Sequence, residues 1–252
     1  MPFRCEHHGT MSDGTATLLP LGPDGVLIRF ADTLSEPANR AALAFRAALS
    51  DVLPEAVTET ATSLTSVFLR FRPDDLRREA LEAMVRDRLE GTNWYEAALP
   101  EGRKLWRLPT CFGGDDGPAL EETAALAGLS ADAAIAEICA NPLRVLALGF
   151  APGQPYLGFL PKHWDIPRQS DVTPQVPRGA VVVAVRQVIP FANAAPTGWR
   201  QIGRTSFRCY DPGQEAPLPL RPGDEVGFLP VSLQELQAAE PRAYGGAEVE
   251  EL

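Results

Sequence analysis

The sequence has few of the residues that most often hold metals or form cross-links. It contains four cysteines, three histidines and three methionines among 252 residues. Cys5, Cys111, Cys139 and Cys209 are far apart and form no CxxC pair, so neither zinc spacing nor a disulfide framework is indicated. We expect buried or idle thiols and no metal site.

Long hydrophobic runs and an excess of basic residues are also missing. No segment approaches the length of a membrane span, and the opening MPFRCEHHGTMSDGT has no apolar core of signal-peptide length. We therefore expect a cytoplasmic protein with a frayed N-terminal tail, in which His7 and His8 hold no metal. The formal net charge of −10 argues against nucleic-acid binding, because phosphate contacts need a basic surface.

Local signatures of several enzyme classes are absent too. The sequence has no GxSxG, no HExxH and no Walker A motif. GDDG at 114–117 predicts a helix-entry turn, because the other ligands of a calcium loop are not there. The residues alone therefore assign no catalytic group.

What is present is an ordinary globular composition, 45% apolar and 22% charged, which predicts a folded core. The first half predicts strands in ATLLPLG and VLIRF, a helix with Ser35 as its N-cap, and a strand at 62–71. A second helix opens at Pro73 and Asp74 and ends at Gly91. Its predicted inward-facing residues are Leu76, Ala80, Met84 and Leu89. The order resembles a ferredoxin-like α+β sandwich, closed near residue 110 by KLWRLPTCF.

The second half predicts two helices between 118 and 140, separated by Gly128. After them, short strand-like runs between prolines and glycines predict a β-barrel: RVLALGF, AVVVAVRQVIPFA, WRQIGRT, FRCYD and DEVGFLP. The chain after Val231 predicts a short helix and a loose acidic tail. We place the boundary in the loop Glu96–Arg103. This gives an α+β domain at 1–102 and a barrel domain at 103–252.

The stretch GFAPGQPYLGFLP, residues 149–161, is unusually stiff for the middle of a domain. Its prolines fix φ, while its glycines allow backbone conformations that are closed to other residues. Such a loop holds Tyr156 in one place with little entropy left to lose on binding. The alternative is a rigid barrel plug with Tyr156 and Phe159 in the core.

Cationic, aromatic and amide side chains gather after this loop. They are Lys162, His163, Arg168, Arg178, Gln187, Trp199, Arg200, Gln201 and Arg204. This composition suits a small anionic ligand such as a carboxylate or carbamoyl group. Our candidate substrate-binding residues are Tyr156, Arg168, Arg178, Gln187, Trp199 and Arg204. The alternative is that the arginines cap strands or pair with the abundant acids.

A family resemblance joins these stretches. The loop at 149–161, VPRGAVVVA at 176–184, PTGWRQIGRT at 196–205, YDP at 210–212 and RPGDEVGFLP at 221–230 follow one another as in the KipI family. This family is also called allophanate hydrolase subunit 1, or the B type of 5-oxoprolinase subunit. The resemblance covers most of residues 15–232. It implies an N-terminal α+β domain followed by a cyclophilin-like barrel.

The resemblance also implies partners. The family forms a carboxyltransferase-like unit with a KipA-like protein, the C-type subunit. In the oxoprolinase system a third, LamB/YcsF-like protein, the A-type subunit, joins them to open 5-oxoproline to glutamate with ATP. The resemblance therefore implies a non-autonomous subunit for 5-oxoproline or for allophanate and urea metabolism, with ATP used by the complex and no cofactor evident in this chain alone.

The sequence departs from the family pattern at several positions. Gln154 stands where the family has an aromatic residue, and Cys139 where it commonly has a histidine. Ala180 stands in place of a serine, and Thr197 in place of a glycine. These changes keep open a regulatory module that inhibits a sensor histidine kinase or binds another protein. A free-standing prolyl isomerase is a third reading, which follows from barrel analogy alone.

Overall fold

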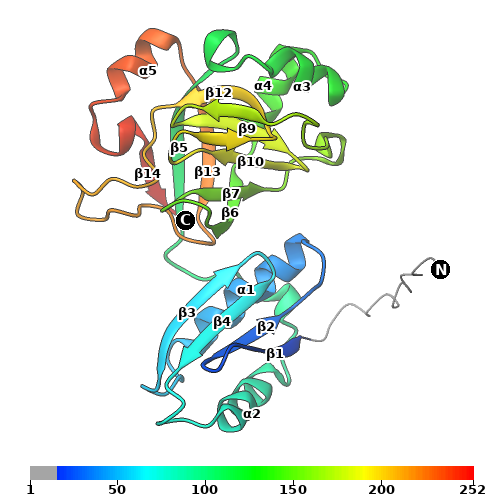
Figure 1. The fold of residues 1–252 in the computed structure, drawn as a ribbon, viewed down its shortest axis with the longest axis vertical. Helices are drawn as coiled ribbons and strands as arrows, with labels where there is room; N and C mark the ends of the chain where they lie inside the picture. The colour runs from blue at the N-terminus through cyan, green and yellow to red at the C-terminus, as the bar shows by residue number, and fades with distance from the viewer. Residues whose placement is uncertain (1–15) are drawn as a thin grey trace, which may run out of the picture. The chain divides into compact units, whose positions relative to one another are not determined.

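The computed structural model describes residues 16–252, so the predicted tail with Cys5, His7 and His8 lies outside the described residues. The chain divides into two compact units between Leu99 and Pro100, within the loop Glu96–Arg103. Figure 1 shows the helices and strands of each unit. Each unit has a hydrophobic core of its own.

The first unit is a four-stranded antiparallel sheet with two helices. Its elements are β1 (Thr17–Leu21), β2 (Gly25–Arg29), α1 (Glu36–Leu49), β3 (Val57–Ser63), β4 (Ser66–Phe71) and α2 (Arg78–Leu89), followed by the short η1 (Trp94–Glu96). The strand order is β1-β2-β4-β3. The segment 62–71, predicted as one strand, contains the end of β3, a turn and β4. Leu64, with φ +54°, lies in the turn of this hairpin.

This strand order is that of a ferredoxin-like sandwich, except that a different strand occupies one outer position. Strands β2 and β3 are joined through α1 and have β4 between them, which is the split βαβ arrangement. The outer strand next to β2 is β1, which precedes β2 in the chain. The prediction that KLWRLPTCF closes this sandwich is wrong, since that segment is a barrel strand.

Helix boundaries follow their capping residues. Ser35 caps α1 as predicted, and its Oγ accepts from the Ala38 N–H. Helix α2 begins at Arg78, five residues later than predicted, and its buried stripe is Leu81 and Val85. The predicted inward positions Ala80 and Met84 are exposed, because the apolar stripe runs through Leu81 and Val85, one residue further on. The other two predicted inward residues, Leu76 and Leu89, do pack against the core.

The second unit is built on a closed seven-stranded barrel. Its strands are β5 (Lys104–Phe112), β6 (Leu143–Leu148), β7 (Pro155–Gly158), β9 (Ala180–Ala184), β10 (Gln187–Pro190), β12 (Arg200–Thr205) and β13 (Glu225–Pro230). They pair in the order β12-β9-β10-β7-β6-β13-β5, and β5 pairs with β12 to close the ring. A separate two-stranded antiparallel sheet pairs β8 (Thr173–Val176) with β11 (Ala195–Thr197). The predicted fold class, a ferredoxin-like sandwich plus a barrel, is confirmed.

Three details of the barrel differ from expectation. The first barrel strand, β5, precedes the helices α3 (Leu120–Leu126) and α4 (Ala131–Ala140) instead of following them. FRCYD forms no strand, since the chain leaves the barrel after β12. The tail after α5 (Leu233–Ala239) is not loose, because β14 (Glu248–Glu251) pairs with β5.

Helices α3 and α4 are apolar, and their buried residues belong to the core. Leu120, Ala124, Ala134 and Ile138 lie in the barrel-unit core. Among residues 16–252 no single helix is long and apolar enough to cross a membrane. The pair α3–α4 reaches that length and composition only together, with an 81° bend between the helices.

Candidate functional site

Strand β9 is buried on both faces, and one of them carries a second apolar cluster beside the main core. This outer-face cluster consists of Val176, Ala180, Val182, Ala184, Ile189, Phe191 and Trp199, with Tyr156 and Ala195 packed against it. Val181 and Val183 belong to the main core, because neighbouring residues on a strand point to opposite faces. The two-stranded sheet β8–β11 contributes Val176 and Ala195, so this face is built by the barrel and the small sheet together.

Three of the six predicted site residues lie on this face. Tyr156 and Trp199 belong to the outer-face cluster, and Gln187 pairs across the sheet with Ala184 and with Gly158. Gln187 is 9% exposed, and its Nε2 has no hydrogen-bond partner among the described residues. A buried donor without an acceptor costs about 1–3 kcal/mol. Within the described residues this buried N–H group therefore has no acceptor.

The predicted arginines are placed differently from one another. The Arg168 guanidinium lies 5.6 Å from the centre of the Trp199 ring, so it joins the outer-face cluster at its edge. Arg178 is exposed, precedes Gly179 and has no ion-pair partner within residues 16–252. Gly179 donates its N–H to the Phe191 carbonyl oxygen, which holds Arg178 close to Phe191.

Arg204 is engaged by carboxylates. Its Nε donates to Asp116 at 2.6 Å, and its Nη1 donates to Glu240 at 3.1 Å. The predicted alternative, in which an arginine pairs with the abundant acids, therefore describes Arg204. Asp116 comes from the GDDG segment, where η2 (Gly114–Asp116) forms the predicted helix-entry turn.

A polar pocket that the sequence did not single out lies around Arg200. It has a volume of about 310 Å³ and is lined by Glu122, Gln169, Ser170, Asp171, Val172, Thr173 and Arg200. The Arg200 side chain is buried, and it donates to Glu122 at 3.0 Å and to the Pro167 carbonyl at 2.7 Å. The sequence placed Arg200 next to Trp199 in the cationic stretch. The spacing of the residues could not show that the Arg200 guanidinium would be buried.

The stiff loop is fixed by its own backbone and by one side-chain amide. Gln154 is fully buried, and its Oε1 accepts from the Ala192 N–H at 3.1 Å. A Cβ atom at Gly153 would overlap the Cys209 carbonyl, so only glycine fits there. The plug alternative names the wrong side chains, because Leu157 and Leu160 fill the core while Tyr156 and Phe159 are half-buried.

Other titratable groups of this unit form smaller contacts. His163 Nε2 lies 2.9 Å from Glu137, and the same carboxylate accepts from the Trp164 indole. Burial raises the pKa of the Cys209 thiol to about 12 and that of Cys139 to about 11. Within residues 16–252 no group of three or more His, Cys, Asp or Glu side chains could hold a metal ion.

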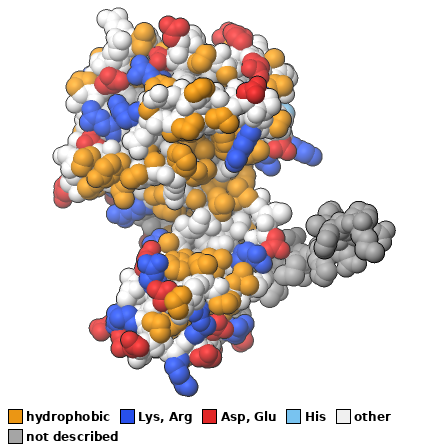
Figure 2. Space-filling view, viewed as in Figure 1, with side chains coloured by type: hydrophobic (Ala, Val, Ile, Leu, Met, Phe, Trp, Pro, Cys, Tyr) orange, Lys and Arg blue, Asp and Glu red, His pale blue; other side chains and the backbone are white. Residues whose placement is uncertain are grey.

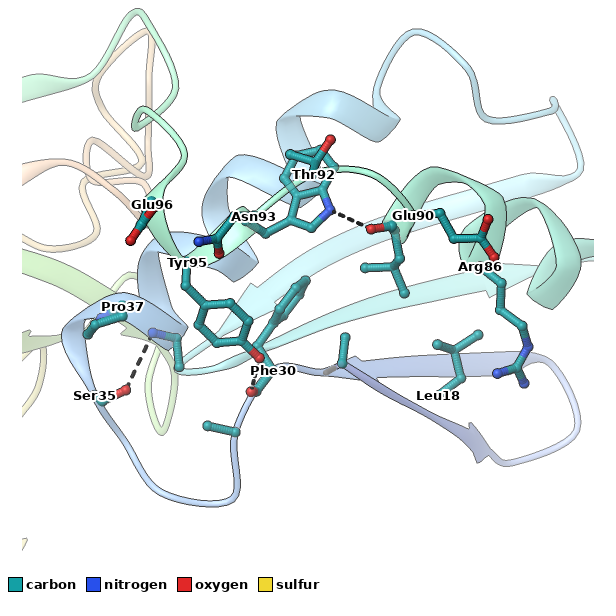
Figure 3. A pocket seen from close by; sticks show the side chains of 15 residues that line it. Leu18, Phe30, Ser35, Pro37, Arg86, Glu90, Thr92, Asn93, Tyr95 and Glu96 are labelled. Carbon is teal, nitrogen blue, oxygen red and sulfur yellow. Dashed lines mark hydrogen bonds between the residues drawn. The ribbon is translucent and has the colours of Figure 1, made fainter. Parts of the chain in front are cut away.

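The first unit contains a larger hollow of about 1090 Å³. It lies between the start of β1, the end of β2 and the segment after α2 (Figure 3). The polar groups of its two large aromatic side chains already have partners. The Tyr95 hydroxyl donates to the Phe30 carbonyl, and the Trp94 indole N–H donates to the Leu89 carbonyl. The remaining lining is mixed: apolar residues of β1, β2 and α1 face the polar residues Ser35, Arg86, Glu90, Thr92, Asn93 and Glu96.

Comparison with known proteins identifies the class of this fold and site. Residues 16–220 match the family model of the carboxyltransferase domain, subdomain C and D. The urea carboxylase of Kluyveromyces lactis shares the fold, with a TM-score of 0.70 at 18% identity over 95% of this chain, which spans 24% of that chain. The solved structure of a protein named TTHA0988 is 34% identical, with a TM-score of 0.68 over 82% of this chain, which spans 40% of that chain.

Two curated relatives narrow the class. The 5-oxoprolinase B subunit of Escherichia coli O157:H7 is 38% identical over 66% of this chain and 73% of that protein. The 5-oxoprolinase B subunit of Bacillus subtilis (strain 168) is 30% identical over 86% of this chain and 94% of that protein. The chain belongs to the carboxyltransferase-domain family that contains these 5-oxoprolinase B subunits, as its motifs predicted.

Proposed function

We propose that this chain is the B subunit of an ATP-dependent 5-oxoprolinase of several subunits, which opens 5-oxoproline to glutamate. The observation that carries the proposal is the similarity to two 5-oxoprolinase B subunits, at 38% and 30% identity, and the face that carries Tyr156, Gln187 and Trp199 supports it. 5-Oxoproline is a small ring with a lactam carbonyl and a carboxylate, so it presents oxygen acceptors at both ends. Gln187 donates to one of these oxygens, and the aromatic residues flank the ring.

Arg168 supplies the charge in this proposal. Its guanidinium stacks on Trp199 and remains exposed, so its N–H groups stay free to bind the substrate carboxylate. Arg204 has no such freedom, because two carboxylates already occupy its donors. In this proposal the chain's own contribution is to bind and orient the amide.

The proposed complex needs further subunits. A protein named as a B subunit implies partner subunits, and we propose a KipA-like protein of the C type and a LamB/YcsF-like protein of the A type. ATP is used at the level of that complex. Allophanate or urea metabolism is the related alternative for the same family. The regulatory module draws no support from the matched relatives, whose names are those of metabolic subunits.

A metabolite measurement tests the proposal in the cell. Deleting the gene for this chain in its own organism should raise intracellular 5-oxoproline, and restoring the gene should return it to the starting level. The change is measured by mass spectrometry of cell extracts. An unchanged 5-oxoproline pool, together with an accumulation of urea or allophanate, would move the assignment to the alternative substrate.

A further inference from the structure

The polar pocket around Arg200 is built on a buried cation. The Arg200 Nε group donates to Glu122 at 3.0 Å, and its Nη1 group donates to the Pro167 carbonyl at 2.7 Å. Its Nη2 group donates to no acceptor within residues 16–252 and remains accessible to solvent. A guanidinium carries five N–H donors, so Arg200 keeps one edge free for a molecule in the pocket that it lines.

One wall of this pocket is the loop 169–173, which is fixed at both ends to the same short stretch of chain. The Gln169 N–H donates to the Gly198 carbonyl at 2.7 Å, and Thr173 pairs with Thr197 in the small sheet β8–β11. Inside the loop the Thr173 hydroxyl donates to the Gln169 side-chain oxygen at 3.3 Å. The loop is therefore held in place without a ligand, so little entropy remains to be lost on binding.

A second wall is the helix α3, which is anchored on β12 beside Arg200. The Ala119 N–H, just before the helix, donates to the Gln201 carbonyl at 2.9 Å. The Gln201 side chain donates in turn to the Asp116 carbonyl at 2.7 Å. Because Gln201 follows Arg200 directly, these bonds fix the position of Glu122 against the guanidinium. Both walls are thus set by the barrel strand that carries the buried charge.

The charges of the pocket leave one donor edge and one carboxylate free. Glu122 is balanced by Arg200, with which it forms an ion pair. Asp171 lines the pocket, is exposed and has no ion-pair partner within the described residues. A simple anion would meet two carboxylates here, and a simple cation would leave the free edge of Arg200 unused. A molecule with one negative and one positive group satisfies both.

We propose that this pocket binds a small α-amino acid as its zwitterion, with the carboxylate on Nη2 of Arg200 and the ammonium on Asp171. The pocket volume of about 310 Å³ suits such a ligand. A neutral side chain is favoured, because the pocket already has one more acidic than basic residue. The inference goes beyond the proposed function, whose residues Tyr156, Gln187 and Trp199 do not line this pocket. 5-Oxoproline lacks the ammonium, since its nitrogen belongs to a lactam.

The test is a titration of the full chain with L-alanine, followed by the amide NMR signals of the loop 169–173. We expect saturable shifts of these signals. Propionate, which lacks the ammonium, should bind about fivefold more weakly, and ethylamine, which lacks the carboxylate, about tenfold more weakly. 5-Oxoproline should not displace L-alanine. No saturable shift with L-alanine, equal binding of propionate, or displacement by 5-oxoproline would each overturn the proposal.

A matched pair of variants separates this pocket from general surface charge. Exposed carboxylates are common on this chain, and Figure 2 shows acidic side chains at separate places on the visible face of the barrel unit. Asp171→Asn should weaken L-alanine binding about fivefold at an unchanged melting temperature and leave propionate binding no weaker. Asp165→Asn makes the same charge change at an exposed position outside the pocket and should bind L-alanine like the unchanged chain. Equal losses in both variants would overturn the site and leave the proposed function standing.

Discussion

Arg204 on β12 donates to Asp116 at 2.6 Å through Nε and to Glu240 at 3.1 Å through Nη1. One guanidinium thus ties the turn before α3 and the end of α5 to the barrel. Because its planar fork serves two carboxylates in different directions, a lysine cannot replace both contacts. This pairing makes Arg204 a stabilising residue in our account.

Arg204→Lys should therefore reduce stability and leave substrate binding unchanged. We expect the free energy of unfolding to fall by about 2 kcal/mol, the usual value for a hydrogen bond to a charged group, measured by urea denaturation. Arg178→Lys, at an exposed and unpaired position, is the control and should change stability little. If Arg204→Lys instead raised the KM for 5-oxoproline at unchanged stability, Arg204 would belong to the substrate site.

Gln187→Met should separate stability from function. Methionine has a similar length and leaves no buried donor unpaired, so the melting temperature should stay the same or rise. In the assembled complex the KM for 5-oxoproline should rise about tenfold, because one hydrogen bond to the substrate is lost. An unchanged KM at unchanged stability would remove Gln187 from the site.

The thiols should differ in reactivity. Burial raises the pKa of Cys209 to about 12, so almost none of it is thiolate at pH 8, and the side chain is covered. We expect thiol reagents at pH 8 to leave Cys209 unmodified in the folded protein and to modify it after denaturation. Cys111, which is partly exposed, is the internal comparison. Fast labelling of Cys209, mapped by peptide mass spectrometry, would contradict the described burial.

Acid should loosen the connection that carries Tyr210 and Leu218. The Arg208 guanidinium donates to Asp211 at 2.9 Å and lowers the pKa of that carboxyl, with further help from the Gly213 N–H. A lowered folded-state pKa contributes stability above the unfolded value of about 3.9, and this contribution is lost as the pH falls through the folded-state pKa. The stability difference between the unchanged chain and Asp211→Asn should therefore be largest near neutral pH and shrink in acid. A stability difference that grows as the pH falls would contradict a lowered pKa of Asp211 in the folded protein.

Local patterns predicted much of the architecture. Ser35 caps α1 as expected, and the strand-like run AVVVAVRQVIPFA becomes the β9–β10 hairpin of the barrel. Pairings between distant segments were harder to predict. The sequence predicts that the segment of β5 ends the first unit, but β5 pairs with β13 and β12. Partners far away in sequence decide which sheet a strand joins.

The candidate site was predictable only in part. Residue type singled out Tyr156, Gln187 and Trp199, and the folded barrel brings them to one face. Nothing in the spacing showed that Arg204 would meet Asp116 and Glu240, which lie 88 and 36 residues away. Gln154 is a similar case: nothing in the spacing showed that its buried side chain would accept from the Ala192 N–H.

Reconstitution of ATP-dependent 5-oxoproline hydrolysis tests the central claim most directly. Glutamate release is measured with the LamB/YcsF-like and KipA-like proteins of the same organism, with and without this chain. The account predicts ATP-dependent glutamate formation only when all three proteins are present, and none from this chain alone. Full activity of the other two proteins without this chain, or turnover by this chain alone, would contradict it.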